Sequence, residues 1–138
     1  MRVLCGTDAT TISRIARAVE RDGERFAQRV FTPDETAFCT ACGKGRDASL
    51  AARFAAKEAV AKALGTGMAG GVALRDIEIV RAPGGAPEVL LHGGALERYE
   101  KLGGCSLSIS LTHEGDLAIA MCVILCEGQT DPQGGNGG

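Results

Sequence analysis

Two acidic residues and one lysine carry the chemistry that the sequence suggests most directly. Glu58 and Lys62 lie one helical turn apart in an alanine-rich run, and Asp8 follows a short apolar stretch near the start of the chain. A Glu–Lys pair at this spacing is most often an ordinary helix-stabilising ion pair. Here Arg53 and Lys57 add two more charges among the alanines, and together the four predict one polar edge on an otherwise apolar helix. Such an edge suits a surface that handles phosphate groups.

A series of arginines near the N-terminus forms a second group of interest. The arginines recur every three or four residues across an expected break at residues 22–23, at Arg14, Arg17, Arg21, Arg25 and Arg29. At helical spacing they predict a basic stripe beside an apolar one. A solvated helix face is the common explanation of such a stripe. A docking surface for an acidic protein is the alternative.

Hydroxyl side chains alternate with apolar ones late in the sequence. The alternation predicts a strand that carries its hydroxyls on one face and ends at His113, with the polar positions at Ser106, Ser108, Ser110 and Thr112. These hydroxyls could contact phosphate or simply water.

Six cysteines raise the question of disulfides or metal. Cys39 and Cys42 have a spacing that suits zinc or redox chemistry, but structural zinc needs a second pair of ligands. The nearest second pair, Cys122 and Cys126, lies in an apolar strand-like run. We therefore expect free thiols in a reducing compartment, and keep a zinc-stabilised interaction module as an alternative.

Size and charge exclude several broad classes. A chain of 138 residues with 45% apolar content fits one ordinary domain. The 15 Lys and Arg residues against 17 Asp and Glu residues lack the basic excess of a nucleic-acid clamp. No apolar stretch approaches the roughly 20 residues of a membrane helix. We expect a cytoplasmic protein with no nucleic-acid or membrane partner.

The order of the expected elements indicates an α+β domain. A strand at residues 3–5 places Asp8 at a strand-to-helix junction, and a helix follows from Ile12. Thr32 and Glu35 predict a capping box for a short helix through residue 38, and the alanine-rich helix starts at residue 47 or 49 and ends at Gly65. Strands at 76–80 and 88–92, a helix at 95–102, and a closing antiparallel hairpin of strands 105–113 and 117–125 complete the order. Residues 127–138 hold no large apolar residue and are expected to be a disordered tail.

Several separated stretches of the chain resemble the holo-acyl-carrier-protein synthase family, the small trimeric type within the 4'-phosphopantetheinyl transferase superfamily. The two signatures of that family are similar to Gly6-Thr7-Asp8 with Ile12 and Arg14, and to Arg53-Phe54-Ala55-Ala56-Lys57-Glu58-Ala59 with Lys62-Ala63-Leu64-Gly65-Thr66-Gly67. Two shorter stretches also agree, Arg29-Val30-Phe31-Thr32 with Glu35 and Cys39, and Ile109-Ser110-Leu111-Thr112-His113. The resemblance covers about residues 1–126, a single domain.

The resemblance implies both a fold and a reaction. The fold would be the α+β 4'-phosphopantetheinyl transferase fold, an antiparallel sheet with a long alanine-rich helix, assembled as a homotrimer with coenzyme A between subunits. The reaction would move 4'-phosphopantetheine from coenzyme A to a serine of an apo-acyl carrier protein, with release of adenosine 3',5'-bisphosphate. A fatty-acid carrier is the default partner, and polyketide carriers suit the same chemistry.

Residue roles follow from the same resemblance. Asp8 and Glu58 would bind Mg²⁺, which prefers oxygen ligands and often uses one or two carboxylates plus substrate phosphate. Lys62 would complete the catalytic group by neutralising phosphate charge, and either Glu58 or a metal-bound water would accept the serine proton. Coenzyme A would contact Arg53, Lys57, Lys62, Gly65, Ser110, Thr112 and His113. The carrier would dock on Arg14, Arg21 and Arg25.

The sequence departs from the family pattern in places. Leu4-Cys5 precedes Gly6-Thr7-Asp8 where an Ile-rich Gly-x-Gly-x-Asp run is common, and Thr11 stands where glutamate is common. Neither change removes an implied metal ligand. A catalytically silent oligomer that binds coenzyme A or a nucleotide is the alternative function, and it would be expected to lack one of the two carboxylates.

Overall fold

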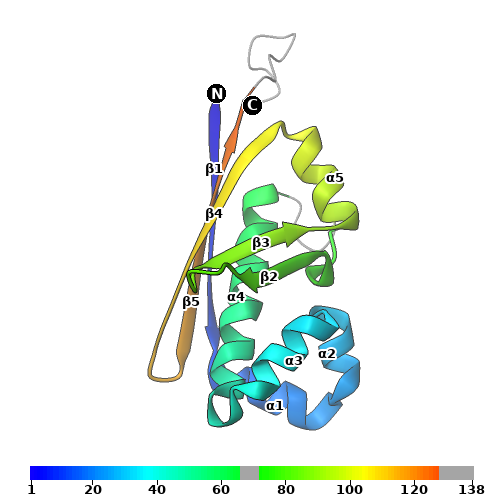
Figure 1. Ribbon diagram of the computed structural model, residues 1–138, viewed down its shortest axis with the longest axis vertical. Helices are drawn as coiled ribbons and strands as arrows, with labels where there is room; N and C mark the ends of the chain where they lie inside the picture. The colour runs from blue at the N-terminus through cyan, green and yellow to red at the C-terminus, as the bar shows by residue number, and fades with distance from the viewer. Residues whose placement is uncertain (66–71, 128–138) are drawn as a thin grey trace.

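The computed structural model describes residues 1–65 and 72–127, which form a mixture of helices and antiparallel strands (Figure 1). In chain order the elements are β1 (Arg2–Thr11), α1 (Ile12–Asp22), α2 (Glu24–Val30), α3 (Pro33–Ala41), the short 3-10 helix η1 (Gly43–Gly45), α4 (Arg46–Leu64), η3 (Leu74–Asp76), β2 (Ile77–Arg81), β3 (Pro87–Leu91), α5 (Gly93–Lys101), β4 (Gly104–Glu114) and β5 (Leu117–Cys126).

Three strands build the main sheet in the order β1-β5-β4, and both pairings are antiparallel. Arg2 lies opposite Cys126, so the first and last strands bring the two ends of the described chain together (Figure 1). The predicted closing hairpin is confirmed as β4 and β5, joined by a turn at Gly115 whose φ of 60° suits glycine. A second, two-stranded sheet pairs β2 with β3.

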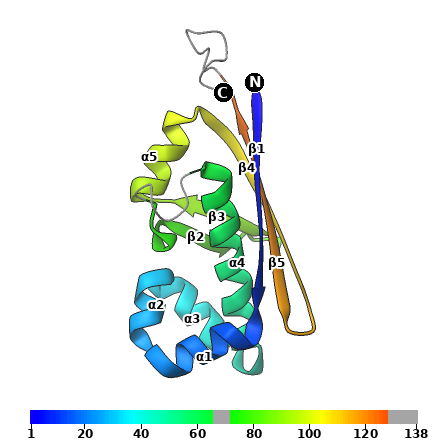
Figure 2. The ribbon, with the colours of Figure 1, turned by 180° about the vertical axis from the view of Figure 1, so that it is seen from behind.

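Helix α4 occupies the centre of the molecule, with the main sheet along one side and the other helices and the β2–β3 hairpin around the rest (Figures 1 and 2). Most of its residues are buried, and many of these are alanines. Small side chains combine high helix propensity with close approach of the neighbouring backbone. The helix ends at Gly65, whose φ of 81° gives the left-handed C-cap that the sequence predicts.

The predicted capping box at the start of α3 is confirmed. Thr32 Oγ1 accepts a hydrogen bond from the Glu35 amide at 3.2 Å, and Glu35 Oε1 accepts one from the Thr32 amide at 2.9 Å. The expected break after α1 occurs at Gly23, which has a φ of 53°. These local signals separate α1 from α2 and start α3.

Some predicted boundaries are wrong, and one of them matters for the site. The first strand runs to Thr11, so Asp8 lies inside β1 rather than at a strand-to-helix junction. Pairing with β5 along its whole length holds Gly6 and Asp8 in the strand, although glycine and aspartate are both depleted in strands. Helix α4 starts at Arg46, and α5 starts at Gly93. Except for Glu127, the predicted tail lies outside the described residues.

All six cysteines lie within residues 1–65 and 72–127, and each is a free thiol. Burial raises the pKa of Cys122 to about 12, so this thiol is inert at neutral pH. Over the described ranges, no group of three or more His, Cys, Asp and Glu side chains could hold a metal ion. No helix in the described part of the chain is long and apolar enough to cross a membrane.

Candidate active site

The candidate site forms where β1 crosses α4. Gly6 makes this crossing possible, because a Cβ atom at residue 6 would lie 2.1 Å from the carbonyl oxygen of Ala59 and 2.7 Å from the amide nitrogen of Ala63. No real side chain tolerates such contacts with backbone atoms. The strand therefore packs directly on the helix, and Asp8, two residues further along the same face, comes to lie beside Lys62.

Asp8 is held by two donors, one on each carboxylate oxygen. Lys62 Nζ lies 3.1 Å from Asp8 Oδ1 and also donates to the carbonyl oxygen of Thr7 at 3.0 Å. The hydroxyl of Thr10 donates to Asp8 Oδ2 at 2.7 Å. The Asp8 side chain is 15% exposed and that of Lys62 is 53% exposed, so the pair lies at the edge of the core and remains open to solvent.

Glu58 lies on α4 one turn before Lys62 and is partly buried. Partial burial raises the pKa of its carboxyl, and the negative charge of Asp8 raises it further. Lys62 and Arg14 oppose both effects. Asp8 and Glu58 therefore interact through their charges although they lie 50 residues apart in sequence.

This donor set fits a magnesium ion. Asp8 on β1 and Glu58 on α4 are close enough for their negative charges to repel, and a bound divalent cation would relieve that repulsion. Both ligands are hard oxygen donors, and a pair of carboxylates leaves room for water and phosphate oxygens. The two residues predicted as metal ligands thus lie near enough for their charges to interact, and their role as ligands stays a prediction.

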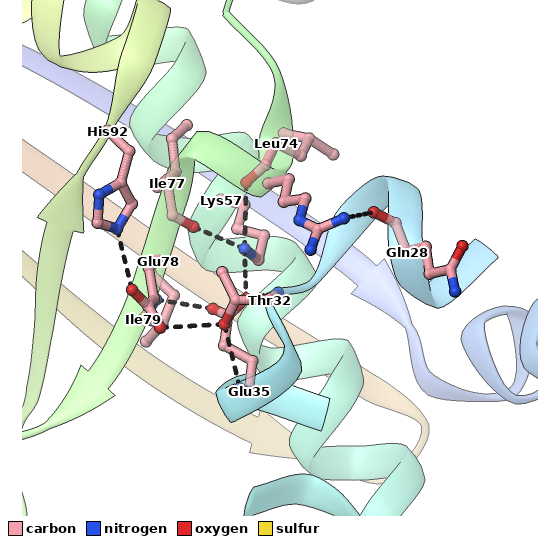
Figure 3. Close-up of polar contacts among 10 residues, drawn as sticks. Gln28, Thr32, Glu35, Lys57, Leu74, Ile77, Glu78, Ile79 and His92 are labelled. Atoms are coloured by element: carbon pink, nitrogen blue, oxygen red, sulfur yellow. Dashed lines mark hydrogen bonds and ion pairs between the residues drawn. The ribbon is translucent and has the colours of Figure 1, made fainter. Parts of the chain in front are cut away.

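Lys57, predicted to contact coenzyme A, lies instead in the core (Figure 3). Its ammonium group is 2.7 Å from Glu35 Oε1 and donates to the carbonyl oxygens of Leu74 at 3.1 Å and Ile77 at 2.6 Å. The side chain has no exposed surface. Burial lowers the pKa of Lys57, and the Glu35 carboxylate opposes this effect. Every donor position of the ammonium has a partner, so we correct this prediction: Lys57 joins α4 to α3, η3 and β2.

The capping-box residue Glu35, which pairs with Lys57, also binds to strand β2. Its other oxygen, Oε2, accepts the amide of Ile79 at 2.7 Å. Thr32 Oγ1 donates to Glu78 Oε2 at 3.0 Å, and the His92 ring nitrogen Nε2 lies 2.9 Å from Glu78 Oε1 (Figure 3). Hydrogen bonds from His92 and Thr32 lower the pKa of Glu78, although burial acts in the opposite direction. The sequence identifies the cap but not its buried lysine partner.

Arg53 is also buried but, unlike Lys57, it has a donor without a hydrogen-bond partner among the described residues. Its guanidinium lies over the Phe38 ring, 4.4 Å from the centroid, and donates to Ser49 Oγ at 2.8 Å. Its Nε atom is buried without a hydrogen-bond partner, and in residues 1–65 and 72–127 no carboxylate pairs with it. A buried cation with spare donors is suited to an anionic ligand.

The predicted polar edge of α4 is therefore two separate faces. Arg53 contacts α3 and Lys57 contacts α3 and β2, whereas Lys62 contacts β1 and Glu58 senses the charge of Asp8 on that strand. Residues 57 and 58 differ by about 100° around a helix, which is enough to place them on different neighbours.

The remaining predicted coenzyme contacts lie apart from the carboxylates. Ser110 and Thr112 are exposed on β4, opposite Met121 and Ile119 of β5, on the sheet face that points away from α4. His113 is exposed near the end of the same strand, and Gly65 is exposed at the end of α4. Within one chain the fold does not gather these residues around Asp8 and Glu58.

The arginine stripe lies on α1 and α2 and is exposed at all five positions. Arg14 connects this surface to the site. Its charge partly offsets the rise in the pKa of Glu58, and its guanidinium lies 5.9 Å from the centre of the Phe54 ring. The basic surface therefore begins beside the carboxylate pair.

Comparison with known proteins identifies the family of this arrangement. Residues 4–122 match the family model described as the 4'-phosphopantetheinyl transferase superfamily. The chain belongs to this superfamily. A protein of Ruminiclostridium cellulolyticum named holo-[acyl-carrier-protein] synthase is 45% identical over 124 residues, which cover 90% of this chain and 92% of that protein.

Solved structures agree with this superfamily assignment. The holo-[acyl-carrier-protein] synthase of Neisseria meningitidis superposes with a TM-score of 0.79 at 40% identity, covering 88% of this chain and 97% of that one. That of Helicobacter pylori, solved in complex with coenzyme A, gives 0.78 at 34% identity, covering 88% and 100%. The predicted α+β 4'-phosphopantetheinyl transferase fold is confirmed.

Proposed function

We propose that this chain transfers 4'-phosphopantetheine from coenzyme A to a serine of an apo-acyl carrier protein, with Mg²⁺ held by Asp8 and Glu58. The observation that carries the proposal is the Asp8–Lys62 pair at the crossing of β1 and α4, with Glu58 one turn before Lys62 and within reach of the charges of both. Relatives named holo-[acyl-carrier-protein] synthase, at 45% identity and above over nearly the whole chain, supply the reaction.

The chemistry is a displacement at phosphorus. The serine oxygen forms a new bond to the β-phosphate of coenzyme A, and the bond to the α-phosphate oxygen breaks, so that adenosine 3',5'-bisphosphate leaves. When bound, Mg²⁺ would draw charge from the phosphate oxygens. Lys62, half exposed on α4, would turn its ammonium from Asp8 toward the phosphates and stabilise the same charge.

The serine proton needs an acceptor, and Glu58 is suited to that role. Partial burial and the neighbouring Asp8 raise the pKa of its carboxyl, which makes the ionised form a stronger base than an ordinary glutamate. A water on the metal is the alternative acceptor. Arg14 beside Glu58, with Arg21 and Arg25 further along the arginine stripe, would guide an acidic carrier toward the site.

Coenzyme A binding requires more than one copy of the chain in this proposal. Ser110 and Thr112 lie on the outer face of the sheet, away from Asp8 and Glu58, so they can contact the same coenzyme only from a second subunit. Val3, Leu117, Ile119 and Met121 expose apolar side chains on this outer face. A face of this kind favours burial in an oligomer. We propose a homotrimer with coenzyme A between subunits.

Arg53, His113 and Gly65 are proposed as further contacts of the nucleotide. Of the three, Arg53 is best suited to bind an anionic group, because its guanidinium is buried and its Nε has no hydrogen-bond partner among the described residues. We also propose the cytoplasm as the location, since all six cysteines are free thiols, as expected in a reducing compartment. A fatty-acid carrier is the default partner in this proposal, and polyketide carriers suit the same chemistry.

Intact-mass measurement of the carrier tests the activity. An apo-acyl carrier protein incubated with the protein, coenzyme A and Mg²⁺ should gain the mass of one phosphopantetheine arm. Substitution of the acceptor serine by alanine in the carrier provides the control and should prevent the gain. A panel of fatty-acid and polyketide carriers that all keep their apo mass would overturn the proposal.

A further inference from the structure

Thr10 is a buried residue that neither the sequence pattern nor the proposed reaction accounts for. It is 2% exposed, lies on β1 next to the site, and its hydroxyl donates to Asp8 Oδ2 at 2.7 Å. Two residues apart on a strand, Asp8 and Thr10 have side chains on the same face, toward α4. A leucine or valine at residue 10 would fill such a site without needing a partner, so the presence of a hydroxyl calls for a physical explanation.

The two carboxylate oxygens of Asp8 have different hydrogen-bond partners. Oδ2 accepts a hydrogen bond from Thr10, whereas Oδ1 lies toward α4, where its hydrogen-bond partner among residues 1–65 and 72–127 is Lys62, whose side chain is 53% exposed. Thr10 is the more rigid of the two partners, because it is β-branched and buried. The Asp8 carboxylate is therefore held through Oδ2 by Thr10, and its second oxygen, Oδ1, lies toward Lys62 on α4.

From this geometry we infer that Thr10 is a positioning residue: by holding Oδ2 it fixes the orientation of the Asp8 carboxylate, which would hold the metal ion, and prevents Lys62 from pairing with both oxygens. The inference rests on the proposed role of Asp8 as a ligand of Mg²⁺. Groups that hydrogen-bond a metal ligand orient it and contribute to affinity, and their loss typically weakens metal binding about 10-fold or more. Without the hydroxyl, the carboxylate is free to rotate and to form a two-oxygen pair with Lys62, which then competes with the metal.

The test is the binding of Mn²⁺ as a probe for the magnesium site. Free Mn²⁺ is followed by electron paramagnetic resonance while it is titrated into the protein with coenzyme A and without carrier, so no turnover occurs. Thr10→Val keeps the shape and removes the donor, and it should bind Mn²⁺ about 10-fold more weakly than the wild type. Thr10→Ser keeps the donor and should stay within about threefold of the wild type. The control is Thr11→Val, which alters an exposed neighbour whose side chain makes no capping hydrogen bond, and it should leave the affinity unchanged.

The variants distinguish positioning from packing. If folded Thr10→Val binds Mn²⁺ within twofold of the wild type, the inference fails. It also fails if Thr10→Ser or Thr11→Val loses as much affinity as Thr10→Val, because the effect would then come from packing or from the end of the strand. Should Thr10→Val not fold, Thr10→Ala replaces it under the same criteria. A wild type that binds Mn²⁺ but transfers nothing overturns the proposed activity alone, whereas a wild type that transfers normally beside an unaffected Thr10→Val overturns only this inference.

Discussion

At the level of single residues, the buried pair of Lys57 and Glu35 is expected to stabilise the fold rather than to bind substrate. Lys57→Met removes one partner and leaves the Glu35 carboxylate buried without its cation, which typically costs about 3–5 kcal/mol in the free energy of unfolding. Urea denaturation measures this loss, and the exposed Lys44→Met serves as the control with little change. A Lys57→Met protein of wild-type stability that no longer binds coenzyme A would restore Lys57 to the coenzyme site.

Glu58 gives a prediction about pH. Its pKa is raised in the folded protein, so between its ordinary value and the raised value the folded state binds more protons than the unfolded state, and stability falls as pH rises. In EDTA at pH 7, Glu58→Gln should therefore have a higher melting temperature than the wild type. The difference should vanish below the ordinary pKa of glutamate, about 4.3, where both forms are neutral. A wild type that melts above Glu58→Gln in EDTA at pH 7 would contradict the repulsion with Asp8.

The sequence predicts these residues unequally, for physical reasons. Asp8, Glu58 and Lys62 can be named because they match the family motifs position by position. The sequence predicts Lys57 as a coenzyme contact on the polar edge rather than as a core residue, because lysine is rarely buried and its partner Glu35 is remote in sequence. Thr10 was missed because its role depends on β1 continuing past Asp8, whereas Gly6-Thr7-Asp8 favours a turn.

At the level of elements, the contact of β1 with α4 sets the distance between Asp8 and α4. Gly6→Ala places a Cβ against the Ala59 oxygen and must push the strand away from the helix. Such overpacking typically costs about 1–3 kcal/mol, and it should also weaken Mn²⁺ binding because Asp8 shifts from Glu58. Urea denaturation and the Mn²⁺ titration measure the two effects. Gly84→Ala has open space around its Cβ and is the matched control. Unchanged stability and affinity in Gly6→Ala would show that the crossing is looser than described.

The sequence predicts helices and strands correctly where residues close together in the chain determine them. The capping box of α3, the glycine at the end of α4 and the alternation of β4 and β5 each depend on neighbours within a few residues. The order β1-β5-β4 depends instead on contacts between the two ends of the chain. Sequence pattern alone predicts strands but not which of them pair over such a separation.

At the level of the whole molecule, the outer face of the main sheet is expected to be an interface between subunits. Met121 is 47% exposed on this face, and Met121→Glu would place a carboxylate in an apolar contact. Light scattering after size-exclusion chromatography should show a trimer for the wild type and smaller species for the variant. Transfer should fall in parallel, because Ser110 and Thr112 of a neighbour are lost from the site. Leu96→Glu, on α5 away from this face, is the control. A monomeric wild type with full activity would contradict the shared site.

The dependence of transfer on Mg²⁺ tests the central claim most directly. The rate of carrier modification is measured by intact mass, in EDTA and with increasing Mg²⁺, for the wild type, Asp8→Asn and the exposed control Glu88→Gln. The two-carboxylate account predicts no transfer in EDTA, full recovery with Mg²⁺ for the wild type and Glu88→Gln, and a rate at least about 100-fold lower for Asp8→Asn at every Mg²⁺ concentration. Transfer at the wild-type rate in EDTA, or by Asp8→Asn with Mg²⁺, would contradict it.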